Sequence, residues 1–394
     1  MTYESAISRR DFVAASALGG LGLWSGVAER GWGEAPQSAS QLLYVGTYTT
    51  GGRREGIHLL RMDSRTGALR HVGAVDAGTN PSFLAIHPGG RALYAVNEVT
   101  ELAGRATGAV SAFTIAPDSG ALTRLSEQSS EGAAPCYVSV DHGGRVVLVA
   151  NYVGGSVALL PIMANGALGR VTHLIQHRGS GPNVERQKSA HAHCIVPHPS
   201  GRFALAADLG VDRVLLYRLD VERGSLVHAE RGDAVMRPGS GPRHLSFHPG
   251  LPLVFVSGEL DSTVTALHCD PGSGALSTVQ TLSTLPEGWT GTNFPADIHV
   301  APSGRTLYVS NRGHDSIAVF SVARATGALA LEQVVSTGGA WPRNFSLDPT
   351  GRWLLVANQR SDSITVFGRD AESGRLTATP QRITVPSPVC LRFA

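Results

Sequence analysis

The sequence has no surplus of either charge and no run of like charges. Its 33 Lys and Arg residues nearly balance 31 Asp and Glu residues, and charged residues make up only 16% of the 394-residue chain. A nucleic-acid patch or an anionic membrane surface calls for a clear excess of positive charge. We therefore expect no nucleic-acid partner and no binding to a membrane surface.

Cysteine is also scarce, with four residues and no Cys-x-x-Cys motif, so the chain has no evident disulfide framework. We expect buried free thiols. Cys136 and Cys194 lie in consecutive repeats and are the one pair that merits a check. Amphipathic helices are absent from the pattern after residue 40. The chain is thus expected to be all-β.

What the sequence does contain is a sevenfold repeat. A Gly-containing turn followed by Leu recurs, and its glycines are 46 to 58 residues apart. A repeat of about 50 residues with short strands is typical of a β-propeller blade. The turns are Thr66–Leu69, Ser119–Leu122, Asn165–Leu168, Arg223–Leu226, Ser273–Leu276, Thr326–Leu329 and Ser373–Leu376.

Each repeat has the pattern of four strands separated by turns that contain Pro and Gly. Leu42–Val45, the first strand after residue 40, matches a second strand, whereas the last segment, Pro388–Phe393, matches a first strand. We therefore predict a seven-bladed β-propeller over residues 41–394, in which the C-terminal strand pairs with the N-terminal blade and leaves no open edge. In the fifth repeat the expected strands are His244–Phe247, Leu253–Ser257, Thr263–His268 and Ala275–Thr281.

Residues 1–40 differ from the rest of the chain. The segment Ser8–Val13 has a twin-arginine pattern, a weakly apolar stretch follows from Ala14 to Val27, and Gly26–Ala28 resembles a cleavage site. We interpret residues 1–40 as an export signal and linker, read by the twin-arginine translocase. The mature chain is then expected in the periplasm or outside the cell, with no stable membrane insertion. A short membrane anchor is the alternative.

Two aligned positions in each blade break the apolar pattern. The first strand of a blade starts, and the second ends, on the same face, so these side chains converge on the mouth of the central channel. The first-strand position reads Ser82, Cys136, His193, Arg243, Ala296, Arg343 and Val389. The position after the second strand reads Tyr48, Glu98, Tyr152, Leu209, Glu259, Arg312 and Gln359. This pattern predicts a polar site at one mouth.

Arg243 and Glu259 stand at the open ends of one hairpin and should lie together. His193 belongs to the preceding blade and Arg312 to the following one. This set suits acid–base chemistry on an anionic substrate, with Glu259 or His193 accepting a proton from water and the arginines binding a carboxylate or stabilising an oxyanion. A structural salt bridge in a water-filled channel is the alternative interpretation.

His191 and His193 form a His-x-His pair, but no third metal ligand is evident, so we expect neither a metal nor a cofactor. Asn311 lies one residue before the functional position. Four of the seven blades carry Asn there, which favours a structural hydrogen bond within the blade. We nevertheless include it among the candidate substrate-binding residues, which are His191, His244, Arg343, Asn311, Glu98 and Gln359.

Several longer segments match motifs of one family. They are Gly181–His191, His191–Cys194, Gly241–His244, Glu259–Ser262, Ser310–Ile317, Pro342–Phe345 and Ala357–Gln359. Together they resemble the propeller-type 6-phosphogluconolactonase family, which includes the fungal carboxy-muconate lactonising enzyme. The resemblance covers residues 41–394. It implies His193 (or His191), Arg243, Glu259 and Arg312 as catalytic residues, the same four that the repeats indicate.

The resemblance implies a metal-independent lactone hydrolase that opens a sugar-acid lactone to the aldonate. Its small-molecule substrate would be a lactone or sugar acid, and we expect a monomer. A phosphorylated pentose-phosphate intermediate is an unusual substrate outside the cytoplasm, which favours an unphosphorylated aldonolactone. Two alternatives are a muconate-type cycloisomerase and a non-enzymatic periplasmic propeller that binds a sugar acid or a protein.

Overall fold

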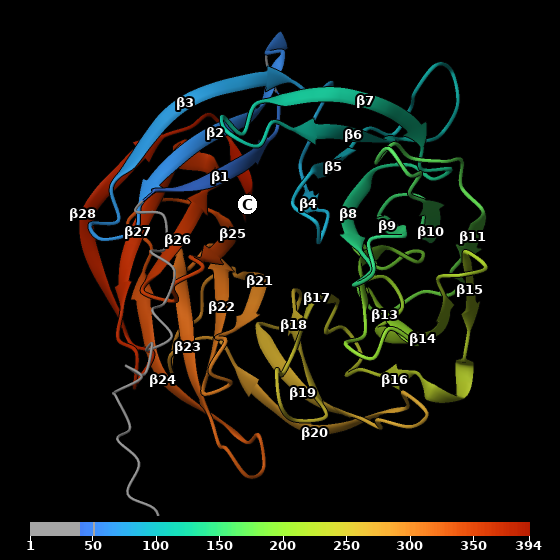
Figure 1. The fold of residues 1–394 in the computed structure, drawn as a ribbon. Helices are drawn as coiled ribbons and strands as arrows, with labels where there is room; N and C mark the ends of the chain where they lie inside the picture. Colours follow the sequence, from blue (N-terminus) through green and yellow to red (C-terminus); the bar gives the residue numbers. More distant parts are fainter. Residues whose placement is uncertain (1–39, 50–51) are drawn as a thin grey trace, which may run out of the picture. The chain divides into compact units, whose positions relative to one another are not determined.

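The computed structural model describes residues 40–49 and 52–394, and these form seven antiparallel sheets arranged as blades around a central axis (Figure 1). The prediction of an all-β, seven-bladed propeller is confirmed. Helical structure in the described residues is limited to short 3-10 turns such as η2 (Glu230–Gly232) and η3 (Gln359–Ser361). None of the helices in this part of the chain has the length and apolar character to cross a membrane. The predicted export signal lies outside the described residues.

Blades 1 to 4 take their strands from the two ends of the chain and its first half. Blade 1 comprises β29 (Pro388–Phe393), β1 (Ser40–Thr47), β2 (Glu55–Asp63) and β3 (Leu69–Asp76). Blade 2 comprises β4 (Leu84–Ile86), β5 (Ala92–Asn97), β6 (Ala109–Ile115) and β7 (Leu122–Ser129). Blade 3 comprises β8 (Pro135–Val140), β9 (Val146–Asn151), β10 (Ser156–Pro161) and β11 (His173–Gln176). Blade 4 comprises β12 (Ala192–Pro197), β13 (Phe203–Asp208), β14 (Arg213–Asp220), β15 (Ser225–His228) and the short β16 (Ala234–Val235).

Blades 5 to 7 complete the ring with four strands each. Blade 5 comprises β17 (Pro242–Phe247), β18 (Leu253–Gly258), β19 (Thr263–Cys269) and β20 (Leu276–Ser283), close to the strands expected from the repeat. Blade 6 comprises β21 (Phe294–Val300), β22 (Thr306–Arg312), β23 (Ser316–Val322) and β24 (Leu329–Ser336). Blade 7 comprises β25 (Pro342–Leu347), β26 (Trp353–Asn358), β27 (Ser363–Arg369) and β28 (Leu376–Thr384).

The two ends of the described chain meet in blade 1, as the repeat pattern predicts. Strand β29 pairs antiparallel with β1, with Val45 opposite Leu391 and Leu43 opposite Phe393. Both strands would otherwise expose a row of unpaired backbone groups. Their pairing joins the last residues of the chain to the first blade and closes the ring.

The core lies between neighbouring sheets and is built mainly by the second strand of each blade. Every residue of β5, β9, β13 and β18 is buried. The outermost strands, such as β3 and β20, are mostly exposed or half-buried. Large side chains such as Phe255 and Phe320 are fully buried, and each contributes about 1.5–3 kcal/mol through burial of apolar surface. All four cysteines are buried and free, as expected.

The glycine of the repeated turn has a clear structural reason. In all seven copies its φ angle is positive, between 59° and 86°, a region that side-chain-bearing residues rarely adopt. In three places a buried tyrosine of one blade donates its hydroxyl hydrogen to the glycine carbonyl of the next repeated turn. These bonds are Tyr44 to Gly120 (2.7 Å), Tyr94 to Gly166 (3.1 Å) and Tyr308 to Gly374 (2.7 Å).

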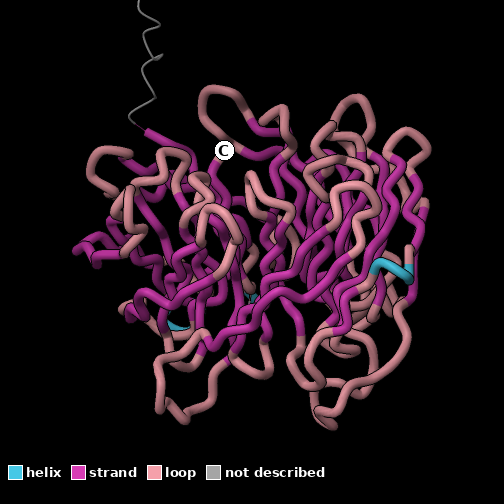
Figure 2. Tube along the Cα trace, turned by 90° about the horizontal axis from the view of Figure 1, so that it is seen from below, coloured by secondary structure: helices cyan, strands magenta, loops and turns pink. Residues whose placement is uncertain are grey.

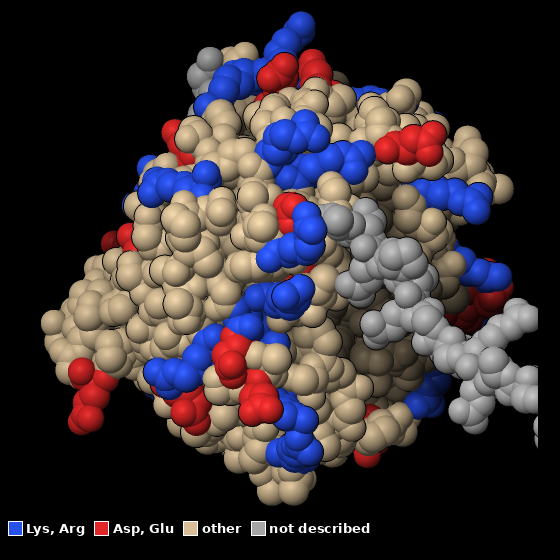
Figure 3. Space-filling view, turned by 60° about the vertical axis from the view of Figure 1, so that its left-hand side comes forward, with Lys and Arg blue, Asp and Glu red and all other residues tan. Residues whose placement is uncertain are grey.

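The connecting loops gather at the two faces of the ring (Figure 2). On the side that carries β3 and β28, acidic and basic side chains lie among one another (Figure 3). Blade 1 has exposed ion pairs, such as Arg65–Asp63 (3.8 Å) and Arg54–Asp76 (3.9 Å). Such exposed pairs contribute little to stability.

Candidate active site

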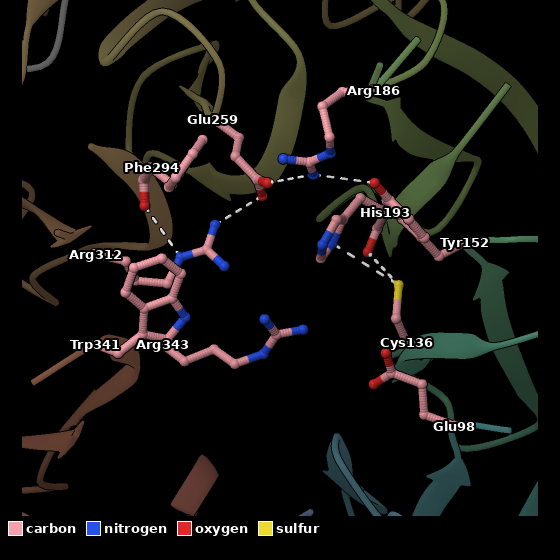
Figure 4. A pocket seen from close by; sticks show the side chains of 10 residues that line it. All are labelled: Glu98, Cys136, Tyr152, Arg186, His193, Glu259, Phe294, Arg312, Trp341 and Arg343. Carbon is pink, nitrogen blue, oxygen red and sulfur yellow. Dashed lines mark hydrogen bonds and ion pairs between the residues drawn. The ribbon is translucent and has the colours of Figure 1, made fainter. Parts of the chain in front are cut away.

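A cavity of about 210 Å³ lies where the starts of the first strands and the ends of the second strands converge (Figure 4). Blades 2 to 7 all contribute to it. Seven of its ten lining residues occupy the two aligned positions that the repeats single out. The lining residues are Glu98, Cys136, Tyr152, Arg186, His193, Glu259, Phe294, Arg312, Trp341 and Arg343.

A local irregularity of the first strands helps to aim these side chains. The strand pairing shifts register at the start of the first strand in blades 3, 4, 5 and 7. Each shift spans the site residue of that blade: Cys136, His193, Arg243 or Arg343. A β-bulge of this kind redirects one side chain without disturbing the rest of the strand. The repeated fold thus presents a different polar group from each blade.

Glu259 binds three guanidinium groups. Its Oε2 atom lies 2.9 Å from Arg243 Nε and 2.8 Å from Arg312 Nη2, while Oε1 accepts a hydrogen bond of 2.7 Å from Arg186 Nη2. The side chains of Glu259, Arg243 and Arg312 are at most 5% exposed. The predicted proximity of Arg243 and Glu259 is therefore confirmed.

This cluster determines the charges of its members. Burial raises the pKa of Glu259, but the three arginines outweigh it and hold that pKa well below the ordinary carboxyl value. Burial lowers the pKa of Arg312 to about 9 despite the opposing effect of Glu259, so this guanidinium is still charged at neutral pH. Glu259 is consequently a permanent carboxylate and a weak base.

The opposite side of the cavity holds a second carboxylate in a different environment. Glu98 accepts hydrogen bonds from the hydroxyls of Tyr48 (2.9 Å) and Ser82 (2.5 Å). Arg343 donates to the same Tyr48 hydroxyl at 2.9 Å and reaches Glu98 only through it. Burial, with Glu98, raises the pKa of Tyr48 against the effect of Arg343, so the hydroxyl keeps its proton. Because Arg343 forms no direct ion pair with a carboxylate, its charge is available to a ligand.

His193 reaches the cavity from the start of β12. It is 5% exposed, its Nδ1 lies 3.8 Å from Cys136 Sγ, and its ring meets the rings of Tyr152 and His244 edge-on. Burial and the nearby Arg243 hold the pKa of His193 well below its ordinary value. The imidazole is therefore neutral and can accept a proton.

A buried chain of polar groups supports Arg243 from behind. Arg243 Nη1 donates to His244 Nε2 at 3.1 Å, and His244 Nδ1 donates to Asp297 at 2.8 Å. Asp297 also accepts hydrogen bonds from His299 and Asn344. Burial and Arg243 lower the pKa of His244 to about 3, so its ring is neutral and its Nε2 is fixed as an acceptor. Arg243 therefore has one preferred orientation.

Within residues 40–49 and 52–394, no group of three or more His, Cys, Asp or Glu side chains is arranged to hold a metal ion. His191 and His193 do not act together. The Nδ1 atom of His191 bonds to the carbonyl of Tyr152 at 2.9 Å, and its ring stacks on the Tyr152 ring. The donors that face the cavity are instead guanidinium groups and hydroxyls, which suit an oxygen-rich anionic ligand.

Residues 42–393 match the family model described as lactonase, 7-bladed beta-propeller. The chain belongs to this family. A 6-phosphogluconolactonase from Bacillus subtilis is 39% identical over 350 residues, which cover 89% of this chain and 97% of that protein. A 6-phosphogluconolactonase from Formosa agariphila is 32% identical, with 87% of this chain and 96% of that protein covered.

A solved structure within this lactonase family is also similar over nearly its full length. The periplasmic gluconolactonase of Pseudomonas aeruginosa superposes with a TM-score of 0.83 at 37% identity. The match covers 90% of this chain and 99% of that structure. The fold is therefore that of the seven-bladed propeller lactonase family.

The structure brings five of the ten predicted site residues into this cavity: Glu98, His193, Glu259, Arg312 and Arg343. Two more, Arg243 and His244, line a smaller space deeper in the channel, together with Glu98 and Arg343. Neither cavity is lined by His191, Asn311 or Gln359.

The positions of these three residues have physical reasons. Asn311 is fully buried, and its amide donates to the Thr284 carbonyl at 2.9 Å, which agrees with the structural interpretation of that position. Gln359 begins a 3-10 turn, so its side chain does not follow the direction of the strand. His191 lies before the bulge that directs His193 inward.

Five lining residues were not among the predicted site residues. Cys136 and Tyr152 stand at the aligned positions, so the repeats contained the signal. Arg186, Phe294 and Trp341 lie outside those positions; Phe294 and Trp341 immediately precede Pro295 and Pro342 at the starts of first strands. Arg186 lies in the connection between β11 and β12, which has no counterpart in the repeat, so aligning the blades does not find it.

Proposed function

We propose that this protein is a lactone hydrolase that opens a sugar-acid lactone to its aldonate. One observation carries this proposal: guanidinium groups and a neutral imidazole surround one cavity. Ester hydrolysis develops negative charge on the carbonyl oxygen, and fixed cations close to that atom lower the barrier. The names of the similar proteins, 6-phosphogluconolactonase and periplasmic gluconolactonase, support a sugar-acid lactone as the substrate.

In the proposed reaction the oxygen of a water molecule forms a bond with the lactone carbonyl carbon while His193 accepts its proton. The carbonyl becomes a tetrahedral oxyanion stabilised by Arg312 and Arg343. The ring C–O bond then breaks, and the proton on His193 passes to the departing ring oxygen. The released carboxyl group ionises, and the same arginines attract it. The product then leaves the cavity as an aldonate.

We propose His193 rather than Glu259 as the proton acceptor, because protonating Glu259 would weaken its ion pairs. Three guanidinium groups stabilise the Glu259 carboxylate, so protonating it would sacrifice all three ion pairs. His193 forms no ion pair among the described residues, so its protonation would not break one, although burial and Arg243 also lower its pKa. We therefore assign Glu259 the role of holding Arg186, Arg243 and Arg312 in place, rather than the role of general base.

We also propose that the protein works in the periplasm. The twin-arginine pattern at Ser8–Val13 and the similarity to a periplasmic gluconolactonase support this location. An unphosphorylated aldonolactone is the substrate that fits this compartment. Arg343 could still accommodate a phosphate, so both forms belong in the test.

The test is acid release from glucono-δ-lactone and from its 6-phosphate, measured by pH-stat above the spontaneous rate. We expect turnover by the wild-type protein and a fall in kcat of at least about a hundredfold in His193→Asn, with an unchanged melting temperature. His191→Asn is the matched control and should retain most of the activity. No turnover of any aldonolactone, or full activity in His193→Asn, would contradict the proposal. Turnover of muconates alone would indicate a cycloisomerase instead.

A further inference from the structure

The connection between β11 and β12, residues 177–191, is longer than the connections that enter the other six blades. We call it the Arg186 loop. It is the only such connection from which a charged side chain reaches the cavity in the described part of the chain. Figure 4 shows Arg186 entering between Glu259 and Tyr152. The loop therefore adds a third guanidinium to the two, of Arg312 and Arg343, that the repeated blades place in this cavity.

Arg186 is the most accessible guanidinium of the Glu259 cluster. Its side chain is 35% exposed, whereas those of Arg243 and Arg312 are 2% and 5% exposed. Its Nη2 atom bonds to Glu259 at 2.7 Å and to the Tyr152 hydroxyl at 3.1 Å. Although burial opposes its charge, these partners raise the pKa of Arg186 above the ordinary value. A ligand arriving from solvent thus meets a permanent cation here.

The two oxygens of Glu259 differ in a way that involves Arg186. Arg243 and Arg312 both bind Oε2, whereas Arg186 alone binds Oε1. Oε1 is therefore the less crowded acceptor of this carboxylate. Arg186 and Oε1 form a donor and an acceptor side by side, which is the pattern that recognises a hydroxyl-bearing ligand.

A single buried carboxylate fixes both ends of the Arg186 loop. Asp208 Oδ2 lies 2.6 Å from His177 Nδ1 at the start of the loop. Its Oδ1 accepts hydrogen bonds from the backbone N–H groups of His191 (2.7 Å), at the end of the loop, and Gly210 (2.9 Å). Asp208 is fully buried. Losing this carboxylate would release both ends of the loop at once.

Comparison with the other blades shows why an acid stands at this place. Asn97, Asn151 and Asn358 end the corresponding second strands, and Asn311 is the last residue but one of β22. The Asn151 and Asn311 amides donate to backbone carbonyls of the segments that enter their blades. In blade 4 the groups around the Asp208 side chain are hydrogen-bond donors instead, because the His177 ring stands where the other two blades have such a carbonyl. A carboxylate accepts at both oxygens and satisfies them, whereas an amide accepts at only one.

The interior of the Arg186 loop is also held in one conformation. Gln187 is fully buried; its Oε1 accepts from the Asn183 N–H at 3.0 Å, and its Nε2 donates to the Leu209 carbonyl at 2.7 Å. Asn183 Oδ1 in turn accepts from the backbone N–H of Arg186 at 3.0 Å. The backbone that carries Arg186 is thereby fastened to the end of β13.

We propose that Arg186 contacts the oxygen atoms of the substrate at the cavity entrance, and that Asp208 is a positioning residue that places Arg186 there. This inference rests on the proposed lactonase function. Arg186 determines substrate affinity rather than the chemical step. Asp208 acts on affinity only through Arg186.

The first experiment compares wild-type protein with Arg186→Gln, using glucono-δ-lactone turnover and calorimetric binding of gluconate and 6-phosphogluconate. We expect KM and the Kd of at least one sugar acid to rise about tenfold while kcat changes less than about threefold, because uniform binding is lost. Arg186→Lys should recover part of the affinity. An unchanged KM and Kd in Arg186→Gln would overturn the proposal while leaving the lactonase activity of the wild type intact.

The second experiment is a double-mutant cycle with Asp208→Ala. We expect Asp208→Ala to raise KM, Asp208→Asn to restore part of the affinity, and Asp208→Ala/Arg186→Gln to be no worse than Arg186→Gln alone. Asn358→Ala, which removes the corresponding side chain of blade 7, should lower the melting temperature without changing KM. Additive effects of the two substitutions on KM, or a KM for Asp208→Ala that matches the wild type, would remove the positioning role.

The two proposals fail in different ways. A wild-type protein that neither turns over aldonolactones nor binds a sugar acid would overturn both. A wild-type protein that binds gluconate without turnover would contradict the lactonase proposal, and the Kd of Arg186→Gln would still test the contact. Circular dichroism and thermal melting of each variant separate local effects from loss of the fold.

Discussion

The cavity contains two carboxylates, and their surroundings differ sharply. Glu259 is held by three guanidinium groups, whereas Glu98 accepts hydrogen bonds from the hydroxyls of Tyr48 and Ser82 and meets Arg343 only through Tyr48. The first arrangement fixes a dense cluster of charge. The second leaves the Arg343 guanidinium without a direct carboxylate partner among the described residues, so that it can bind an anion. The comparison teaches that one side of the cavity is organised for rigidity and the other for ligand binding.

The largest expected effect comes from Glu259→Gln, which leaves three guanidinium groups without a counter-charge, two of them buried. We expect a loss of stability on the order of 3–5 kcal/mol and a fall in kcat/KM of at least about a thousandfold. Thermal melting and pH-stat kinetics measure the two effects. Glu98→Gln is the matched control and should destabilise the protein far less. Equal melting temperatures for the two variants would contradict the proposed difference between the carboxylates.

The next prediction tests whether Arg343 binds the substrate. Arg343→Gln should raise KM for an aldonolactone by about 10- to 100-fold, because a hydrogen bond to a charged group contributes about 1.5–3 kcal/mol. Arg360→Gln serves as a control, since Arg360 belongs to the same blade and its guanidinium lies over an aromatic ring, that of Trp341 at 3.5 Å, but it does not line the cavity. Similar KM values for the two variants would show that Arg343 does not bind substrate.

A smaller effect is expected from Tyr48→Phe. This substitution removes the hydroxyl that links Arg343 to Glu98 but keeps the ring, over which Arg343 lies at 5.4 Å. Arg343 keeps its charge and loses only one of the contacts that orient it, so KM should rise by about fivefold, which corresponds to about 1 kcal/mol. Steady-state kinetics at constant pH measure the change. If KM rises as much as in Arg343→Gln, the hydroxyl itself contacts the substrate.

The smallest effect concerns pH. A base must be unprotonated to act, and burial keeps the pKa of His193 well below the ordinary value of 6.5. Lowering the pH from 7.5 to 5.5 should therefore leave kcat/KM nearly constant once spontaneous hydrolysis is subtracted. A loss of activity centred near pH 6.5 would show instead that a histidine with an ordinary pKa is the base, and that burial and the arginines do not lower the pKa of His193.

The fold could be predicted almost completely because the information is repeated seven times. The repeated glycines adopt positive φ angles, and the first and last strands match complementary halves of one blade. An error in assigning the strands of one repeat would be corrected by comparison with the other six repeats. Strand boundaries in blade 5 agree within a few residues for the same reason.

The site could be predicted only in part because its residues are the exceptions to the repeat. Aligned positions indicated Glu259 and Arg312, and they also placed Asn311 one residue earlier, where a side chain points to the opposite face of a strand. The resemblance to the family nevertheless kept Asn311 among the candidates, although its side chain bonds within the structure. Arg186 was missed because an insertion has no counterpart in other blades. The three-arginine environment of Glu259 depends on that insertion and could not be foreseen.

The pairing of β29 with β1 has a consequence for synthesis of the chain. The six residues of β29 are translated after all the other strands of the propeller, yet they complete the blade that contains β1. Until the ribosome releases them, β1 has a free edge and the circle stays open. The native state therefore depends on a contact between residues about 350 positions apart. Such a distant contact slows folding and makes ring closure a late step. A nascent protein that stops short of Pro388 would carry every side chain of the cavity and still lack the closed ring.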